Sequence, residues 1–482
     1  MKRTWRAILA LTLVCAVALT AAAMALGSKA LPLTMTDACT IGDPAAAEGL
    51  HMAARIGMEQ NRLQWRMDYD PAADTTDASF RLAYSDRSGQ WIFDGYGYNI
   101  QCLLVNQEDD SDPICREVLR QARASGEELV DVTVHLADYW QDLPLSLSSA
   151  SWPGGGDFCD VYGPWDIGDT VPFPALSIPV RESDDLTVTL ARNADGSYEL
   201  SGYDFTGISA AMYFTPFSLP LEGGTLTTLG IDPAAQPQPD WAPEGYGLWY
   251  VPVQTDDDGS STPVPSRRQL VYPLDITRQQ VVTLKQEELG GTVYLMTQED
   301  GQLVLRLLEG GTYRLLQELS LGPVPESDPG TGGYHTLTIR DGFAVVLWED
   351  QLTVLSRTEG YHLDYTCPTQ TAYVTGYTVS FTDPEPEKQD DEDAMPYTVA
   401  PNFAMAYQDG KLAVAAYIGN SCVLLLEVYG PEGLLYATAR VPSVERQFAA
   451  DNVRSMWVRE DKKAPFPEAD ISTPIPELTW EK

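Results

Sequence analysis

The sequence predicts an all-β protein, in which an N-terminal membrane helix is followed by an antiparallel β body. Apolar residues recur at every second position through most of the chain, which is typical of half-buried strands. Clusters of Gly, Asn and Asp interrupt these runs and predict tight turns between the strands. One long apolar segment near the amino terminus has about the length needed to span a bilayer.

The amino terminus has the pattern of an export signal. Lys2, Arg3 and Arg6 precede residues 7–26, a run of 20 predominantly apolar residues. This run is longer than a secretory core of about 7 to 15 residues, so an uncleaved membrane anchor is the first interpretation. The alternative is a signal peptide cleaved after Ala23-Met24-Ala25, which would secrete the body. In both cases the positive flank stays in the cytoplasm and the body is extracytoplasmic.

Charge restricts the partners of this body. The 482-residue chain contains 69 acidic against 31 basic residues and has a formal net charge of −38. Such a surface repels phosphates, so we expect no nucleic acid partner. An anionic lipid surface would repel the body as well. Any contact with a membrane is therefore expected through the N-terminal segment only.

Length and composition predict several parts. About 100 to 200 residues per domain suggests more than one folded unit, and the Pro-rich stretch 233–244 is the best candidate linker. The predicted parts are a signal peptide or membrane anchor (1–27), an N-terminal β region with one short helix (28–232), the linker (233–244), C-terminal β repeats (245–455) and a tail (456–482).

One helix is predicted within the N-terminal β region. Asp112 is a suitable N-cap, Pro113 fits the first turn and Gly126 ends the helix. The apolar residues of this segment lie on one helical face: Ile114, Val118 and Ala122. We interpret this helix as a connector between strands.

The C-terminal half repeats one strand pattern. Asp300-Gly301, Asp341-Gly342 and Asp409-Gly410 predict tight hairpins, and the first two pairs are 41 residues apart. Runs of four strands surround the second and third pairs; the longer interval of 68 residues between them includes a charged, Pro-containing insertion at 383–396. Four short antiparallel strands at a period near 40 resemble the blades of β-propeller-type repeat proteins. The resemblance is architectural and names no family. A β-sandwich array is the alternative.

No motif for catalysis or metal binding stands out. The chain lacks a G-x-S-x-G elbow, a C-x-x-C or H-E-x-x-H zinc pattern and a Walker loop. The acidic stretches 256–259 and 109–112 are better interpreted as a turn and a helix cap than as calcium loops. We therefore expect no cofactor, no metal site and no catalytic residue identifiable from the sequence.

The cysteines leave the redox chemistry open. Six lie outside the N-terminal segment, which allows 15 pairings. A bond between Cys102 and Cys115 would close a short loop, while unpaired buried thiols are an equally good interpretation.

A loop at residues 151–169 is the one candidate ligand site. It combines aromatic rings, which could stack on a sugar or hold a partner's side chain, with carboxylates that could accept hydrogen bonds. The candidate ligand-binding residues are Trp152, Phe158, Tyr162, Trp165, Asp157 and Asp160. The simpler interpretation, which we favour, is a long loop that buries its own aromatic side chains.

Two functions fit these features. The first is a non-enzymatic, membrane-anchored surface protein that binds an unidentified protein, peptide or glycan as a sensor or assembly module. The second is an extracytoplasmic carbohydrate-active hydrolase that uses paired carboxylates. The abundance of acidic residues means that composition alone does not separate the two.

Overall fold

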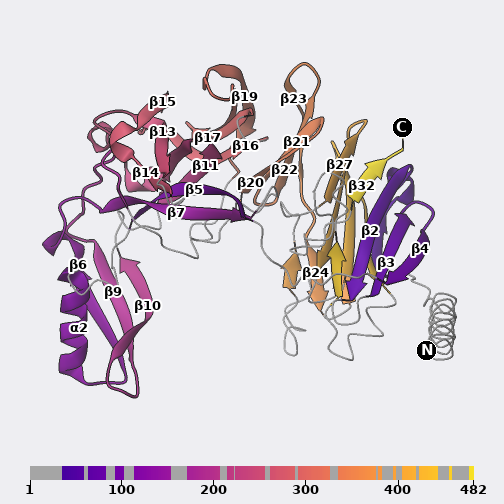
Figure 1. Cartoon of the computed structure of the whole chain (residues 1–482). Helices are drawn as coiled ribbons and strands as arrows, with labels where there is room; N and C mark the ends of the chain where they lie inside the picture. The colour runs from indigo at the N-terminus through magenta and orange to yellow at the C-terminus, as the bar shows by residue number, and fades with distance from the viewer. Residues whose placement is uncertain are drawn as a thin grey trace, which may run out of the picture. The chain divides into compact units, whose positions relative to one another are not determined.

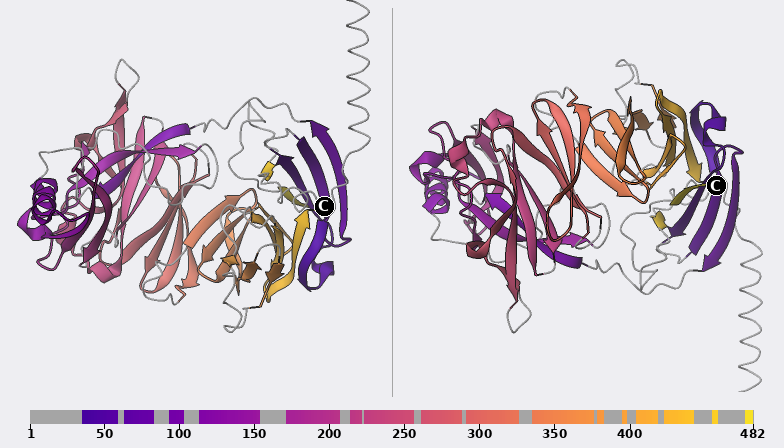
Figure 2. Two further views of the ribbon diagram at one scale, coloured as in Figure 1. Left: turned by 90° about the horizontal axis from the view of Figure 1, so that it is seen from below. Right: turned by 90° about the horizontal axis from the view of Figure 1, so that it is seen from above.

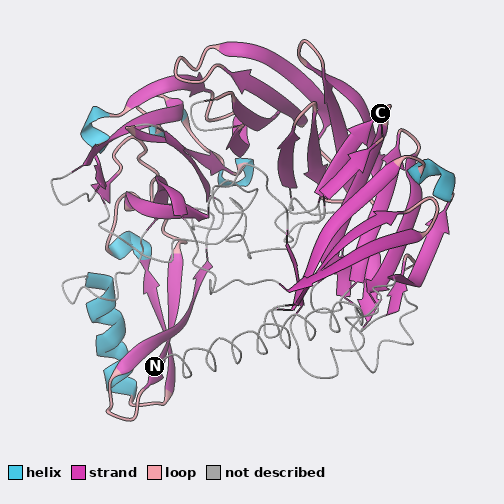
Figure 3. Cartoon of the chain, turned by 45° about the vertical axis from the view of Figure 1, so that its right-hand side comes forward, coloured by secondary structure: helices cyan, strands magenta, loops and turns pink. Residues whose placement is uncertain are grey.

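Strands account for most of the described residues of this computed structural model, and α2 (Pro113–Ser125) is the one α-helix among them (Figure 3). The structure describes residues 35–58, 63–82, 93–102, 113–153, 171–206, 214–221, 223–255, 261–287, 291–325, 335–375, 378–382, 395–397, 404–418, 423–442, 455–458 and 477–481. Five short 3-10 helices join strands: η1 (Pro44–Ala47), η2 (Leu136–Asp138), η4 (Pro233–Ala235), η5 (Pro239–Trp241) and η6 (Pro265–Arg267).

The chain divides into two compact units at other places than the predicted linker. Unit 1 comprises residues 1–91 and 329–482, and unit 2 comprises residues 92–328. The stretch 233–244 lies inside unit 2, where Ala235, Trp241 and Ala242 are buried in the hydrophobic core. Its prolines are compatible with a linker, but its apolar side chains pack against the unit and make it part of the core.

Two sheets of unit 1 have the predicted four-stranded order. In each, four antiparallel strands pair in chain order, and this arrangement resembles the blades of β-propeller-type proteins. The first contains β20 (His335–Arg340), β21 (Phe343–Trp348), β22 (Gln351–Arg357) and β23 (Tyr361–Pro368). The second contains β27 (Ala404–Gln408), β28 (Lys411–Ile418), β29 (Val423–Gly430) and β30 (Gly433–Pro442).

The Asp-Gly pairs form the predicted turns. Asp409 and Gly410 have φ values of 51° and 77°, and Asp300 and Gly301 have 49° and 76°. Two successive positive φ values are the signature of the type I′ hairpin, whose twist matches that of the strands. At the Asp341-Gly342 turn only Gly342 has a positive φ, 85°.

Both ends of the described chain complete sheets of unit 1. Strand β1 (Met35–Gly42) pairs with β30 as a fifth strand. The sheet formed by β2 (Leu50–Met58), β3 (Leu63–Asp70) and β4 (Thr75–Leu82) is completed by β31 (Ser455–Val458) and β32 (Glu477–Trp480), which pair with successive halves of β2. Figure 1 shows β32 beside β2, at opposite ends of the colour scale.

Sheets of unit 1 pack face to face, as the views in Figure 2 show for the strands near the two ends of the colour scale. One core joins the β2–β4 sheet to the β27–β30 sheet through Leu50, Met52, Leu424 and Leu426. A second joins β20–β23 to the other face of β27–β30. All eight residues of β29 are buried. A small sheet of β24 (Ala372–Thr375), β25 (Thr378–Ser380) and β26 (Met395–Tyr397) packs against β29 and β30.

Unit 2 contains two further blade-like sheets. One has the order β11-β12-β13-β15, with β14 (Ser261–Pro263) as an extra hairpin strand. Its other strands are β11 (Phe214–Leu221), β12 (Gly224–Ile231), β13 (Tyr246–Thr255) and β15 (Gln269–Leu274). The other sheet contains β16 (Gln279–Gln286), β17 (Val293–Glu299), β18 (Gln302–Leu308) and β19 (Leu315–Pro323).

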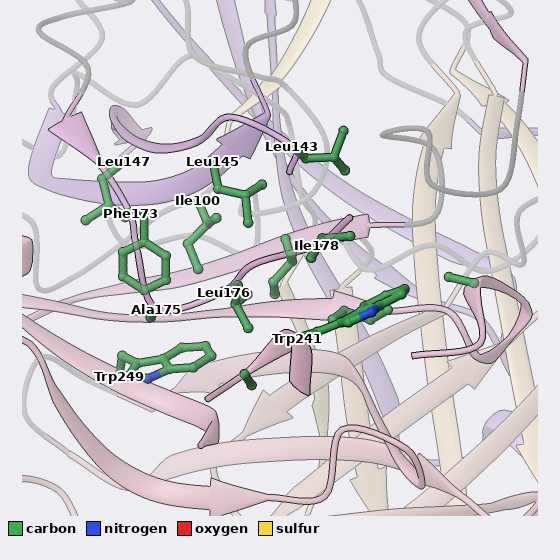
Figure 4. Close-up of a cluster of buried hydrophobic side chains, with 14 of the residues drawn as sticks. Ile100, Leu143, Leu145, Leu147, Phe173, Ala175, Leu176, Ile178, Trp241 and Trp249 are labelled. Carbon is green, nitrogen blue, oxygen red and sulfur yellow. The ribbon is translucent and has the colours of Figure 1, made fainter. Parts of the chain in front are cut away.

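The core of unit 2 lies between these sheets and a three-stranded one. That sheet comprises β5 (Phe93–Cys102), β7 (Leu145–Pro153) and β8 (Val171–Pro172). Figure 4 shows Ile100 and Leu147 from β5 and β7 beside Phe173, with Trp249 nearby. The Phe173 and Trp249 rings meet edge to face with centroids 5.6 Å apart, a favoured aromatic geometry.

The membrane helix stays a prediction, because residues 7–26 lie outside the described part of the chain. Among the residues that are described, no helix has both the length and the apolar character needed to cross a bilayer. The described body is therefore an antiparallel β structure with blade-like sheets.

Candidate functional site

The predicted aromatic loop lies almost entirely outside the described residues. Trp152 belongs to β7, where its backbone pairs with Gly95 of β5. Phe158, Tyr162, Trp165, Asp157 and Asp160 are not among the described residues. Their grouping around a ligand therefore stays a prediction.

A sheet covered on one face only is the best candidate surface in unit 2. It contains β6 (Leu129–His135), β9 (Asp185–Arg192) and β10 (Tyr198–Thr206) in the order β10-β9-β6. Figure 1 shows α2 beside β6 in this part of the molecule. We call these four elements the α2 module.

The local sequence explains the covered face. In β6, Val130, Val132 and Val134 are buried while the residues between them are exposed, as expected for period-two alternation. Ile114, Val118 and Ala122 of α2 belong to the same core. The Gly126 N–H bonds to the Ala122 carbonyl at 3.2 Å, and Gly126 has φ +70°, a common way to end a helix. The predicted helix is confirmed, and it is a core element as well as a connector.

The opposite face of this sheet carries a row of polar pairs between β6 and β9. The Thr133 and Thr187 hydroxyls lie 2.9 Å apart, and Thr189 donates to the Asp131 carboxylate at 2.7 Å. His135 Nδ1 lies 2.5 Å from an oxygen of Asp185. Each pair joins residues that are directly opposite in the strand register. We call this exposed surface the polar ladder.

The electrostatics of the polar ladder are set at its His135 end. The hydrogen bond that His135 donates to Asp185 and the charge of that carboxylate raise the pKa of the His135 imidazole, which favours the protonated form. At the other end Leu129 exposes 59% of its surface. The ladder therefore offers an imidazole, carboxylates, hydroxyls and one apolar side chain along the paired strands β6 and β9.

Strand β10 is irregular at the edge of the α2 module. Its register with β9 shifts between Leu200 and Gly202, as at a β-bulge. The shift places Tyr203 opposite the buried Val188, yet Tyr203 is 64% exposed. An exposed aromatic ring thus lies at the edge of the sheet, on the side that also carries α2.

Two buried arginines each contact a pair of carboxylates. In unit 2, Arg306 bonds to Glu299 and, at 2.8 Å, to Glu318. In unit 1, Arg440 lies 3.1 Å from Asp74 and 3.8 Å from Asp37. Both arginine side chains are 7% exposed. Each pair of carboxylates therefore has an arginine side chain as its shared partner.

The Glu299 carboxyl therefore differs from the general acid of a glycoside hydrolase. Burial opposes ionisation of Glu299, but hydrogen bonds from Arg306, Thr297 and Gln279 leave its pKa below the usual value. A general acid for glycoside cleavage needs a raised pKa and a partner carboxylate with space for a sugar between them. An arginine occupies the space between Glu299 and Glu318.

One carboxyl does have a raised pKa. Glu427 of β29 is 1% exposed, and burial raises its pKa to about 8, against the effect of a hydrogen bond from Tyr429. It faces the core between sheets of unit 1, where a polymeric substrate has no access. Burial makes Glu427 a structural acid; the sequence could not show this, because a single Glu in an apolar strand looks like any surface position.

The three histidines whose side chains are described do not form a catalytic or metal group with one another. His51 Nε2 lies 3.1 Å from Glu481, His135 pairs with Asp185, and His362 is an exposed residue of β23. His135 lies on the face opposite its valines, as the alternation predicted. Among the described residues, no three His, Cys, Asp or Glu side chains are grouped to hold a metal ion.

Comparisons with known proteins do not assign the chain to a family. No family model matches it, and no curated protein matches it. Solved structures that match include a Pseudomonas aeruginosa periplasmic gluconolactonase. The match has 13% sequence identity, covers 80% of this chain and 96% of that chain, and has a TM-score of 0.25. A putative 6-phosphogluconolactonase from Bacteroides uniformis shares 9% identity over 65% and 100% of the two chains, with a TM-score of 0.23.

A β-propeller is named among these structures. The Cps50 (Swd1) β-propeller domain of Myceliophteria thermophila shares 8% identity over 64% of this chain and 88% of that chain, with a TM-score of 0.23. The resemblance of this chain to β-propeller-type repeat proteins stands on the strand order of its sheets.

Proposed function

We propose that the protein is a non-enzymatic binding module and that the polar ladder of the α2 module is its recognition surface. One observation carries the proposal: α2 covers one face of the β10-β9-β6 sheet, while the other face exposes ordered cross-strand pairs. Side chains held by neighbours lose little freedom on binding, and such preorganisation favours recognition.

The chemistry of the ladder favours a protein partner with a positively charged surface. Asp131 and Asp185 lie on the ladder and Asp204 of β10 is exposed beside it, while His135 is the one basic side chain that β6 contributes. The net charge of −38 adds a long-range field of the same sign. Complementary charge accelerates encounter and selects partners, and Leu129 adds an apolar contact at one end.

The proposal includes the place of action. The basic flank and residues 7–26 would anchor the chain in a membrane, or be removed as a signal peptide, with the body on the extracytoplasmic side. The partner is then a component of that compartment or of the membrane surface. The alternative, a carbohydrate-active hydrolase, has less support, because the close carboxylate pairs described above bind arginines.

The test compares two charge reversals on the purified full-length chain. Asp131→Lys changes the ladder, and Glu359→Lys makes the same charge change at an exposed position of unit 1. Envelope proteins are captured on each variant and on the unaltered chain, and their affinities are measured individually. We expect Asp131→Lys to weaken the affinity for at least one partner by tenfold or more. Glu359→Lys should bind that partner with nearly the affinity of the unaltered chain. Equal binding by both variants, or turnover of a glycoside by the unaltered chain, would contradict the proposal.

A further inference from the structure

A buried carboxyl lies where the β27–β30 sheet meets the segment between β23 and β24. Glu427 Oε2 accepts a hydrogen bond from the Tyr429 hydroxyl at 2.8 Å. The same hydroxyl accepts the backbone N–H of Gln370 at 3.0 Å. Glu427 Oε1 is buried and has no hydrogen-bond partner among the described residues. One chain of hydrogen bonds therefore joins Glu427 to residues 369–371.

Gln370 holds this segment in place. Its Nε2 donates to the carbonyls of Thr371 and Phe381, both at 2.9 Å, so it ties the start of β24 to the residue that follows β25. Tyr365 of β23 donates to the Tyr429 carbonyl at 3.4 Å. Loss of the Tyr429–Gln370 contact would therefore free the backbone of Gln370 from β29, while the Tyr365 hydrogen bond still joins β23 to β29.

Among the described residues, none around Glu427 brings a cation to its carboxyl. The facing titratable groups are Tyr365 and Cys367 from β23, Tyr429 from its own strand and Cys39 from β1. The strands β24 and β25 contribute Ala372, Val374 and Val379. Arg440 of β30 pairs with Leu424, which lies on the opposite face of β29 from Glu427 because alternate residues point to opposite faces.

We propose that Glu427 is a proton-dependent latch, whose neutral carboxyl holds Tyr429 and Gln370 together and whose ionisation accompanies separation of residues 369–371 from β29. A carboxylate without a cation or a full set of donors is costly inside a protein, so the closed state keeps the proton. When the segment opens, water reaches the carboxyl and the proton leaves.

The sign of the pH dependence follows from this proton balance. An exposed Glu loses its proton near 4.5, and burial raises the pKa of Glu427 to about 8 in the closed state. Between these values the closed state binds one more proton than the open state. Opening therefore becomes more favourable by up to about tenfold per pH unit. The stabilisation is complete below pH 4.5 and is lost as the pH rises toward 8.

Hydrogen exchange at the Gln370 amide tests the latch in the full-length chain. When reclosing is fast, the exchange rate equals the intrinsic rate multiplied by the equilibrium constant for opening. The intrinsic rate itself rises about tenfold per pH unit. We expect the unaltered chain to show a dependence approaching a hundredfold per pH unit between pH 5 and 8. Glu427→Gln keeps the shape and cannot ionise, so its dependence should return to tenfold.

Two further measurements separate the latch from a purely structural role. Tyr429→Phe removes the bridge to Gln370 and leaves the carboxyl buried, so exchange should be faster at every pH while the steep dependence remains. The Leu295 amide, in the central strand β17 of unit 2, should keep the intrinsic tenfold dependence in the unaltered chain. If Gln370 and Leu295 show the same dependence, the latch is refuted even if Glu427→Gln does not fold.

Discussion

Individual glycines in unit 1 differ in what they contribute to the fold. Gly42, at the end of β1, has φ +80°, and a Cβ there would lie 2.2 Å from the Leu435 carbonyl oxygen. Gly410, in the turn between β27 and β28, has φ +77° with nothing within 4 Å of an added Cβ. Both positions need a left-handed backbone, but only Gly42 also needs the absence of a side chain.

We predict different costs for the same substitution at these two sites. Gly410→Ala should lower the free energy of unfolding by about 1 kcal/mol, because only the backbone conformation is penalised. Gly42→Ala should cost more, because β1 must also move away from β30. Urea unfolding of the two variants measures the difference, and equal costs would contradict the role given to the Leu435 contact.

Glu299 should respond to pH in the opposite sense from Glu427. Its pKa lies below the usual value through the hydrogen bonds from Arg306, Thr297 and Gln279, despite burial. The contribution of Glu299 to folding stability is therefore present above the unfolded pKa of about 4.5. It is lost as the pH falls through the pKa of Glu299 in the folded state. Glu299→Gln should destabilise unit 2 by about 1.5 to 3 kcal/mol near pH 7, the range for hydrogen bonds to charged groups.

The measurement is a pair of urea titrations at pH 7 and at acidic pH. The difference between Glu299→Gln and the unaltered chain should shrink under acid, since the native Glu299 then carries a proton too. A matched variant is Glu318→Gln, whose side chain is 51% exposed and whose loss should cost less. A larger effect at acidic pH would show that the ion pair is assigned wrongly.

At the scale of elements, unit 1 depends on strands from both ends of the described chain. The four residues of β32 pair with Leu50–Ala53 of β2, and Glu481 N–H bonds to the Gly49 carbonyl at 2.7 Å. Lys411 lies 5.8 Å from the centre of the Trp480 ring. These contacts anchor a strand too short to be stable without the sheet.

We predict that a chain ending after residue 476 loses protection at this edge. Backbone amides of β2 near Leu50 should exchange faster, because β32 no longer covers them, and unit 1 should unfold at a lower urea concentration. Unit 2 should be unchanged, since β31 and β32 belong to unit 1. A chain ending after Glu481 is the control. Unchanged exchange at β2 in the shorter chain would mean that β32 does not stabilise the sheet.

The α2 module shows how element-scale prediction succeeds and where it stops. The apolar spacing at Ile114, Val118 and Ala122, together with Gly126, predicted the helix and its end. The helix was interpreted as a connector because its target is not local: the strands it covers include β9, some 60 residues further along the chain. Periodicity indicates that a face is buried, but it does not name the partner.

For the whole molecule, the proposed place of action rests on the first 26 residues. On the proposed topology, Lys2, Arg3 and Arg6 would hold the start of the chain at the inner face, in keeping with the positive-inside rule. We predict that protease added to intact cells degrades the body, and that replacing the three cations by Glu protects it by blocking correct insertion. Immunoblotting of treated cells measures both outcomes. A body protected in the unaltered chain would refute the export proposal.

The sequence by itself determined the short-range structure of this protein. Alternation and the Asp-Gly pairs placed the strands and turns of the β20–β23 and β27–β30 sheets close to where they are observed, because both signals depend on neighbours within one hairpin. They did not predict the small sheet of β24, β25 and β26. The sequence could not determine that β1 joins β30, or that β31 and β32 complete the β2 sheet. Those pairings join residues about 400 positions apart, and alternation is the same for any partner strand.

The tertiary structure alone decided which polar residues matter. Glu427 became a protonated buried acid because two sheets close over β29. Asp131, Thr133 and His135 share a face of β6 by alternation, but they have Thr189, Thr187 and Asp185 as partners because β9 pairs beside β6 in a particular register. The candidate aromatic loop, lying outside the described residues, stays a prediction. Local chemistry sets where strands and turns form, whereas burial and proximity arise only when distant strands meet, and those two quantities govern pKa values and binding surfaces.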